Sequence, residues 1–393
     1  MIPLHQVKTY RQKVILLITR PFSQTNQNLS HTIMSVYNKT PLIRQIFPSI
    51  PQMYLKHECF QPSGSFKSRG IGHLISKQSQ RILGNGLGKK PMVFASSGGN
   101  AGLAAATAAK FLNLPCTVVI PTATKQRMAD KIRATGANVI VSGNFWKEAD
   151  NYLKDNILSK LEELHKNVEP IYVHPFDNPD IWEGHASMVD EIVEDFKNKM
   201  IPLNKIKAIV CSVGGGGLYN GIIQGLEKYN LADKIPIVGV ETKGCHVFNT
   251  SLRMNKVVSF KKITSIATSL GTADISTEAF KYAKRYGTKS VVLSDQDVVK
   301  TCLRYTHDFN MVIEPACGAA VHLAYHTEIL EKELGTKLNA DDIVLVVACG
   351  GSSNTVEDME SILQRLSTEE NNINIPNVAE NIIVRMPEVS VLA

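Results

Sequence analysis

Short runs of aliphatic and β-branched residues alternate with helix-length segments along almost the whole chain of 393 residues. Several of these runs, such as IVLVVACG at 343–350, show little polar alternation, which is typical of strands covered on both faces. Buried strands that alternate with helices form parallel sheets, because each parallel connection needs a crossover. The sequence therefore predicts an α/β fold with parallel sheets flanked by helices. The predicted strands lie at 53–58, 92–96, 117–121, 138–143, 171–175, 207–214, 236–241, 289–294 and 343–350.

Four loops rich in glycine and serine follow predicted strands. They read PSGSFKSRG (62–70), SSGGNAG (96–102), VGGGGLYNG (213–221) and ACGGSSN (348–354). In folds of this kind ligands bind at the carboxyl ends of the strands, where loops meet the first turns of helices. The four loops together therefore predict a single site lined by backbone amides.

Lys67 lies in the first of these loops, two residues after a Ser-Gly-Ser turn and at the start of a predicted helix. The positive end of a helix dipole disfavours a lysine in its cationic form. A lysine that is less protonated can form a Schiff base with an aldehyde. The alternative interpretation is a solvated surface charge on a loose turn, and this segment alone leaves both open.

The run Gly214–Gly217 precedes a predicted helix and has the character of a phosphate cradle. Without side chains, the backbone can approach an anion and direct several N–H groups toward it, with the helix dipole behind them. The run lacks the Lys-Ser/Thr of a Walker loop and fits no GxGxxG register, so neither nucleotide fingerprint applies. A tight turn between strand and helix, without a ligand, is the alternative.

The remaining two loops add a carboxylate clamp and a cysteine. Backbone amides of SSGGNAG can bind a carboxylate, and Asn100 offers a side-chain amide, although a well-capped helix start is the simpler interpretation. Cys349 ends a predicted buried strand, where a cysteine is usually an inert small hydrophobe. A Schiff-base lysine, a phosphate cradle and a carboxylate clamp would all be used by pyridoxal phosphate, which carries an aldehyde and a phosphate.

Charge and cysteine content exclude several other classes of protein. Residues 1–57 hold seven basic side chains and no acidic one, which equals the whole net charge of +7, so the rest of the chain is neutral and nucleic-acid binding is not indicated. No apolar run approaches the roughly 18 residues of a membrane span. The seven cysteines are widely spaced without a CxxC pair, which predicts neither disulfides nor zinc and is typical of a reducing compartment.

Residues 1–33 are free of acidic side chains, carry two Arg and two Lys, and are rich in hydroxyl and amide side chains after Arg20. This profile predicts a mitochondrial targeting segment. A short disordered tail, or translation that begins at Met34, would instead leave the protein in the cytoplasm.

The motifs PSGSFKSRG, SSGGNAG, SVGGGGLYNG, EPACGAA and ACGGSSN, in this order and spacing, resemble those of the serine/threonine dehydratases, and most of all the catabolic L-serine/L-threonine members. These enzymes belong to the tryptophan-synthase-β-like pyridoxal-phosphate enzymes of fold type II. The resemblance runs from about residue 34 to about residue 370 and implies a two-domain α/β enzyme. The expected domains are a large one at 34–66 and 166–370, a small one at 67–165, and a tail at 371–393.

The resemblance also implies roles for particular residues. Lys67 would bind the cofactor covalently and act as the catalytic base, and Asn100 would bind the 3-hydroxyl of the cofactor. Cys349 would face the pyridine nitrogen, where a thiol favours β-elimination over transamination. The phosphate would be bound by Gly214, Gly215, Gly216, Gly217 and Leu218, and the substrate carboxylate by the loop of Ser96, Ser97, Gly98, Asn100 and Ala101.

Relatives hold a monovalent cation, usually potassium, near the glycine loop. The matching positions are Gly214, Glu241, Cys245, Val247, Leu270 and Thr272. Only Glu241 brings an ionised side chain to this set, and several of the others would act through backbone carbonyls. Glu241 by itself could equally be a structural acid.

The implied activity is the conversion of L-serine to pyruvate and of L-threonine to 2-oxobutyrate, with release of ammonia, by an ammonia-lyase. The expected partners are small amino acids and a second copy of the chain in a homodimer, with no nucleic acid or membrane. Alternatives are another enzyme of this fold, such as serine racemase or cysteine synthase, or a non-catalytic relative. A nucleotide-dependent dehydrogenase is disfavoured because GxGxxG is missing.

Overall fold

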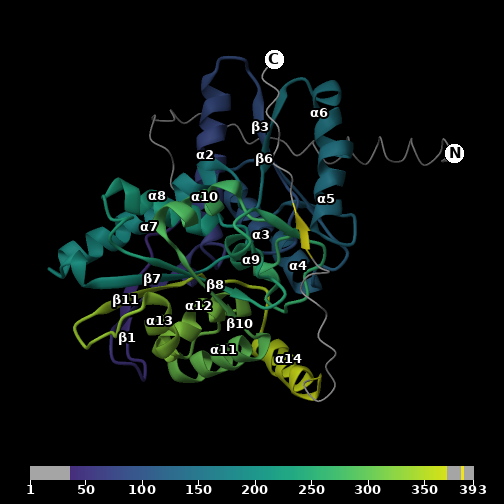
Figure 1. The fold of residues 1–393 in the computed structure, drawn as a ribbon. Coiled ribbons are helices and arrows are strands. Elements are labelled where there is room, and N and C mark those ends of the chain that lie inside the picture. Colours follow the sequence, from purple (N-terminus) through teal and green to yellow (C-terminus); the bar gives the residue numbers. More distant parts are fainter. Residues whose placement is uncertain (1–35, 370–381, 385–393) are drawn as a thin grey trace.

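The computed structural model describes residues 36–369 and 382–384, which form two parallel sheets, each flanked by helices (Figure 1). The predicted α/β fold is therefore confirmed. The larger sheet has the order β1 (Leu42–Gln45), β2 (Gln52–His57), β11 (Ile343–Ala348), β7 (Ile206–Ser212), β8 (Ile237–Thr242), β10 (Lys289–Leu293). The smaller sheet has the order β5 (Asn138–Val141), β4 (Cys116–Ile120), β3 (Lys90–Ala95), β6 (Val168–Val173).

Neighbouring strands are parallel throughout the smaller sheet and in the larger sheet except for the antiparallel pair β1 and β2. Every predicted strand is present. Strand β1 was not predicted, because its residues, LIRQ, are mostly solvent-accessible and form no aliphatic run. The short antiparallel pair β9 (Val258–Phe260) and β12 (Ile382–Val384) was not predicted either.

Helices connect the strands and cover the sheets. Around the smaller sheet lie α2 (Lys67–Gly84), α3 (Asn100–Phe111), α4 (Gln126–Ala134), α5 (Trp146–Tyr152) and α6 (Ser159–Leu164), with a π-helical turn at Leu153–Leu158. The larger sheet is accompanied by α7 (Pro179–Asn198), α8 (Gly217–Lys228), α9 (Val247–Arg253), α10 (Thr277–Tyr286), α11 (Asp295–Phe309), α12 (Pro315–Tyr325), α13 (Thr327–Leu334) and α14 (Val356–Glu369). Three single 3₁₀ turns lie at Glu58–Phe60, Leu203–Lys205 and Thr268–Leu270.

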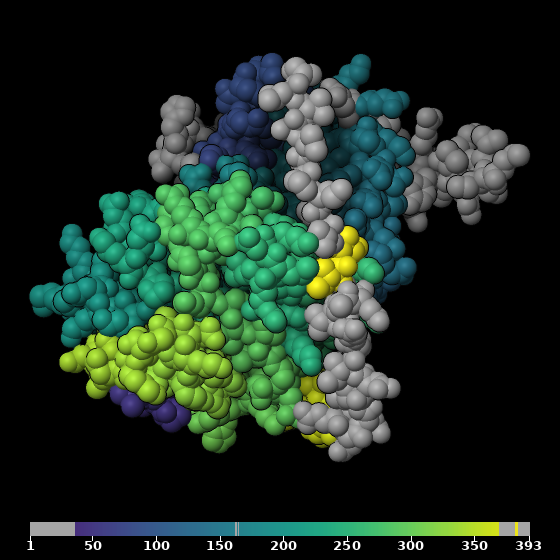
Figure 2. Space-filling model, in the orientation of Figure 1, coloured from purple at the N-terminus to yellow at the C-terminus, as the bar shows by residue number. Residues whose placement is uncertain are grey.

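Each sheet has a hydrophobic core of its own. In the larger part, α12 is buried along its whole length, since its small residues, PACGAAVHLAY, allow close contact with β7, β8 and β11. In the smaller part, the alanine-rich helix α3 packs on β3, β4 and α2 for the same reason. The space-filling view shows the smaller part, in blue, above the larger part, in green (Figure 2).

The predicted domain limits remain predictions, but two strands bear on them. Strand β6 follows the predicted limit at residue 165 and yet pairs with β3 in the smaller sheet. Strand β12 lies within the predicted tail at 371–393 and pairs with β9, and Figure 2 shows it in yellow on the surface. The predicted targeting segment, residues 1–33, lies outside the described residues. Within the described part, no helix combines the length and apolarity that a membrane crossing requires.

Candidate active site

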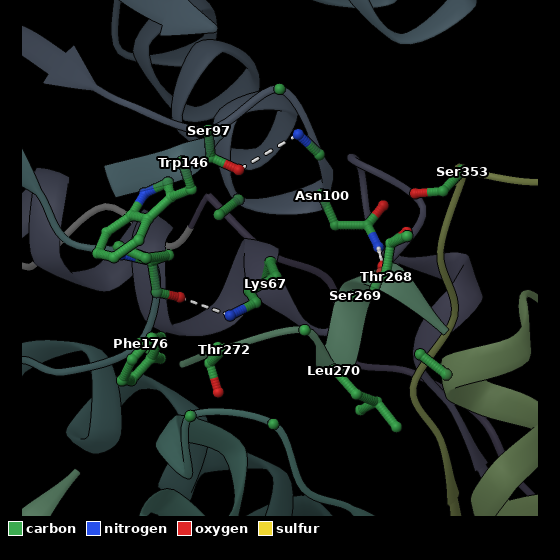
Figure 3. Close-up of a pocket in the computed structure, with 18 of the residues that line it drawn as sticks. Lys67, Ser97, Asn100, Trp146, Phe176, Thr268, Ser269, Leu270, Thr272 and Ser353 are labelled. Atoms are coloured by element: carbon green, nitrogen blue, oxygen red, sulfur yellow. Dashed lines mark hydrogen bonds between the residues drawn. The ribbon is translucent and has the colours of Figure 1, made fainter. Parts of the chain in front are cut away.

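A cavity of about 430 Å³ lies between the two parts of the molecule. All four loops that were predicted to share a site contribute to its wall, each from the carboxyl end of its strand. Figure 3 shows Lys67, Ser97, Asn100, Thr272 and Ser353 around this space. The cavity is therefore formed jointly by residues of the smaller and the larger part.

Lys67 is the first residue of α2 and lines the cavity. Backbone contacts hold its loop against the loop that follows β11: the amide of Phe66 donates to the carbonyl of Cys349 (3.0 Å), and the amide of Gly351 donates to the carbonyl of Gly64 (2.9 Å). The Lys67 amine donates a hydrogen bond to the carbonyl of Pro175. Burial lowers the pKa of Lys67 to about 8, so near neutral pH a far larger fraction of the amine is neutral and nucleophilic than in a lysine with the ordinary pKa near 10.5, and the cation is still the major form.

A buried ionic cluster anchors α2 directly after Lys67. The Arg69 guanidinium donates to Glu58 (2.7 and 2.8 Å) and to Glu191 (2.6 and 2.7 Å), and Lys56 also donates to Glu191 (2.6 Å). The side chain of Arg69 is fully buried. Because Glu58 follows β2 and Glu191 lies on α7, the cluster fixes the first turn of α2, and with it Lys67, to both neighbouring elements.

The glycine loop leads into α8 with a left-handed residue, Gly216, at φ +93°. A Cβ on Gly215 would lie 2.4 Å from the Phe176 ring, and a Cβ on Gly217 would lie 2.7 Å from the Phe176 carbonyl oxygen. Only glycine therefore fits here, and the chain exposes its amides at the first turn of α8, where backbone N–H groups have no intrahelical acceptor. Gly214, Gly215, Gly216, Gly217 and Leu218 all line the cavity.

The loop after β3 contributes Ser97, Gly98, Asn100 and Ala101 to the cavity wall. Ser96, which was predicted to belong to the substrate loop, lies behind it: its side chain is buried and donates to Asp150 (2.7 Å). Asp150 also accepts from Tyr172 (2.7 Å), and its pKa is lowered by hydrogen bonds that outweigh the opposing effect of burial. Ser96 thus holds the loop in place and does not reach the cavity.

The Asn100 side chain is held by three contacts from the larger part. Its Nδ2 donates to Glu314 Oε1 (2.8 Å) and to Ser269 Oγ (3.2 Å), and its Oδ1 accepts from the amide of Ser352 (3.1 Å). Glu314 is a buried carboxylate that lines the cavity, and burial raises its pKa. Glu314 was not among the predicted site residues, although an acidic side chain directly before a largely apolar helix is a signal in the sequence.

Cys349 lies at the end of β11 and lines the cavity, while its side chain is buried. A hydrogen bond with Cys317 and burial raise the pKa of the Cys349 thiol. The thiol is therefore neutral at physiological pH and places no negative charge at this wall of the cavity.

The residues predicted to bind a cation fall into two groups. Gly214, Leu270 and Thr272 line the cavity, whereas Glu241 lies deeper and accepts from the amides of Phe248 (2.9 Å) and Asn249 (2.7 Å) in α9. Burial raises the pKa of Glu241 to about 8. The remaining members, Cys245 and Val247, are buried near the start of α9. In residues 36–369 and 382–384 no three His, Cys, Asp or Glu side chains gather as metal ligands.

The cavity fits pyridoxal phosphate. The amine of Lys67, with its lowered pKa, suits the aldehyde, and the glycine loop forms a backbone cradle in which a Cβ on Gly215, Gly216 or Gly217 would clash with neighbouring protein atoms. The amide of Asn100 lines the same cavity, where residues of the larger part hold it. The fold and this donor set define a pyridoxal-phosphate-dependent enzyme of the tryptophan-synthase-β type.

Comparisons with known proteins agree. Residues 33–350 match the family described as pyridoxal-phosphate dependent enzyme, and the chain belongs to it. Within that family the chain belongs to the serine/threonine dehydratases. It is 66% identical to a catabolic L-serine/threonine dehydratase of Saccharomyces cerevisiae (88% of this chain, 96% of the relative). It is 56% identical to an L-serine dehydratase of the same species (83% and 96%).

Solved structures add to this comparison. A fungal L-serine ammonia-lyase from Rhizomucor miehei superimposes with a TM-score of 0.73 at 29% identity, over 84% of this chain and 99% of that one. A maize serine racemase superimposes with a TM-score of 0.67 at 21% identity, over 85% and 94%. At that identity the racemase shows the shared fold alone.

Proposed function

We propose that this chain is an L-serine/L-threonine ammonia-lyase that converts L-serine to pyruvate and L-threonine to 2-oxobutyrate, with release of ammonia. The observation that carries the proposal is the amine of Lys67, held in a cavity that also contains the glycine loop and the Ser97–Ala101 loop. Dehydratase names of relatives that are 66% and 56% identical support the same reaction.

Lys67 has the central part in the chemistry. Bound pyridoxal phosphate withdraws electrons from the α-carbon of an amino acid and makes its proton acidic. Lys67 would hold the cofactor through Nζ and, when free, would remove the α-proton of the substrate. Its pKa near 8 favours both roles, because the neutral amine is the reactive form.

The other loops bind and orient. The Gly214–Leu218 segment would hold the phosphate through backbone amides, and Asn100 would hold the ring hydroxyl. Backbone amides of Ser97, Gly98 and Ala101 would hold the substrate carboxylate, with their loop fixed from behind by Ser96 and Asp150. The neutral thiol of Cys349 would stabilise no positive charge on the ring nitrogen, which favours loss of the β-hydroxyl over transamination.

The test is to purify the full chain with cofactor, record its visible absorbance, and add L-serine while pyruvate and ammonia are assayed in the same tube. Stoichiometric pyruvate and ammonia are expected, together with a change in the absorbance of the bound cofactor. The Lys67→Ala variant should lose both signals. A coloured protein that leaves L-serine intact, or converts it to D-serine, would contradict the proposed reaction.

We also propose three finer properties. A monovalent cation such as potassium would lie beside Gly214 and Leu270, which are neighbours: a Cβ on Gly214 would lie 3.3 Å from the Leu270 carbonyl oxygen. Activity should then be lost when potassium is replaced by a large organic cation.

The second property is a homodimer, which the family resemblance supports. Light scattering of the purified protein tests it. The third property is mitochondrial import, which the basic composition of residues 1–33 supports. Cell fractionation tests it, with a cytoplasmic location as the alternative.

A further inference from the structure

Thr272 is one of the residues around the cavity, and its hydroxyl has no hydrogen-bond partner among the described residues. Its Oγ1 atom is buried, so bulk water does not solvate it. A buried polar atom without a partner costs about 1–3 kcal/mol, and native proteins contain few of them. The hydroxyl is therefore suited to a ligand that enters the cavity.

The surrounding contacts place Thr272 at the glycine loop. The backbone of Leu270 packs directly on Gly214, since a Cβ there would lie 3.2 Å from the Leu270 Cα atom. Beyond Thr272, the amide of Ser276 donates to the carbonyl of Gly215 (2.9 Å). The segment is thus attached to the loop on both sides of Thr272. Figure 3 shows the Thr272 side chain between Phe176 and Leu270, with its hydroxyl turned away from Lys67.

The ligand group that belongs at this place is an anion. The glycine loop and the first turn of α8 direct backbone N–H groups into the same part of the cavity, and Phe176 closes the loop from the other side. Among the residues that the structure describes, Glu314 is the one acidic side chain around the cavity, and it lies beside Asn100 and not at this end. A hydroxyl that donates to a phosphate oxygen forms a charge-assisted hydrogen bond, which is stronger than one between neutral groups.

We propose that Thr272 Oγ1 donates a hydrogen bond to the phosphate of the cofactor and so adds a side-chain ligand to the backbone cradle of Gly214–Leu218. The proposal rests on the proposed function only in its use of pyridoxal phosphate. It is distinct from the predicted cation site, in which several residues of the set would take part through backbone carbonyls, because it uses the side-chain hydroxyl of Thr272.

Thr124 offers a matched control in the same cavity. Its hydroxyl is also buried and without a partner among the described residues. It lies on the other side, however, within 2.0 Å of where a Cβ on Gly98 would be, at the loop predicted to bind the substrate carboxylate. Thr124→Val and Thr272→Val therefore each remove a buried hydroxyl that has no partner among the described residues. The difference is that Thr272 neighbours the glycine loop and Thr124 neighbours the Gly98 loop.

The experiment compares pyridoxal phosphate with pyridoxal, which lacks the phosphate, as ligands of the full-length apoprotein in equilibrium dialysis. Thr272→Val should weaken pyridoxal phosphate about tenfold, the value of one hydrogen bond to a charged group, and leave pyridoxal unchanged. Thr272→Ser should restore the affinity, and Thr124→Val should not alter the ratio of the two affinities. The proposal would be overturned if Thr272→Val lowered the affinity for both ligands equally, or if it lowered neither affinity.

Two further readouts keep the outcomes distinct. If Thr272→Val does not fold, as judged by circular dichroism, Thr272→Ala takes its place. The ³¹P chemical shift of bound pyridoxal phosphate is then compared among the wild type, Thr272→Ser, which keeps the hydroxyl, and Thr272→Ala, which removes it. A shift and an affinity in Thr272→Ala that are identical to those of the wild type would overturn the contact. The two proposals can fail separately. If the wild-type protein forms no pyruvate from L-serine, and Thr272→Val still weakens pyridoxal phosphate but not pyridoxal, the contact between Thr272 and the phosphate is supported and the dehydratase reaction is contradicted.

Discussion

Asn100 Nδ2 donates a hydrogen bond of 2.8 Å to Glu314 Oε1, and this contact joins the first residue of α3 in the smaller part to the residue that precedes α12 in the larger part. The two residues are 214 positions apart in the chain. Glu314 also accepts from the amide of Ser353 (3.2 Å), which lies in the loop after β11. One buried carboxylate thus fixes the side-chain amide of Asn100 relative to two other walls of the cavity.

Replacement of Glu314 is expected to lower both the stability of the protein and its affinity for the cofactor. Glu314→Ala leaves the Ser353 amide without its acceptor and the Asn100 amide with Ser269 as its remaining acceptor, which should lower the free energy of unfolding by about 1–3 kcal/mol and weaken cofactor binding. Glu314→Gln keeps one acceptor oxygen and should have a smaller effect on both. Urea denaturation and cofactor titration measure the two quantities, and equal behaviour of both variants would contradict this account.

The ionic cluster around Arg69 yields a prediction about stability. Arg69→Met leaves the carboxylates of Glu58 and Glu191 buried without their main partner, which should lower the free energy of unfolding by about 3–5 kcal/mol. The control is Arg81→Met, since the Arg81 side chain is 69% exposed and its pair with Glu169 should contribute less than about 1 kcal/mol. Chemical denaturation of the two variants should separate them clearly, and similar losses would show that burial does not decide the effect.

The glycine loop can be tested with a pair of left-handed glycines. Gly216→Ala forces a Cβ to within 2.6 Å of the Ala279 Cβ atom and strains a backbone at φ +93°, so cofactor affinity should fall at least tenfold. Gly287, which ends α10 at φ +60°, has open space around its Cβ position. Gly287→Ala should therefore cost only about 1 kcal/mol of stability, from backbone conformation, and leave cofactor affinity intact.

The pKa of Lys67 leads to a pH dependence of cofactor uptake. Burial lowers this pKa to about 8 from the ordinary lysine value near 10.5, so the neutral amine becomes the major form above about pH 8. The rate at which the apoprotein forms its covalent linkage to pyridoxal phosphate should rise between about pH 7 and pH 9 and then level off. Stopped-flow absorbance measures this rate, and a rise that continues to pH 10 or beyond would mean that Lys67 has an ordinary pKa.

Local sequence patterns were enough for much of the fold and for part of the site. The aliphatic strands, the four loops and Lys67 are visible in short segments because burial on both faces and glycine-rich turns leave a local signature. The pattern could not reveal that Ser96 turns to Asp150, or that Glu314 meets Asn100, since these contacts depend on how distant segments pack. Strand β6 was assigned to the large domain for a related reason: its residues are typical of a buried strand, but nothing in them says which sheet they join.

The position of Arg69, two residues after Lys67, has a consequence for quality control in the cell. The lysine that would carry the cofactor can occupy its place only when β2, α7 and the start of α2 have assembled around the buried guanidinium. A chain in which this assembly has failed cannot present its amine correctly. Cofactor loading therefore serves as an internal report that this part of the core has folded.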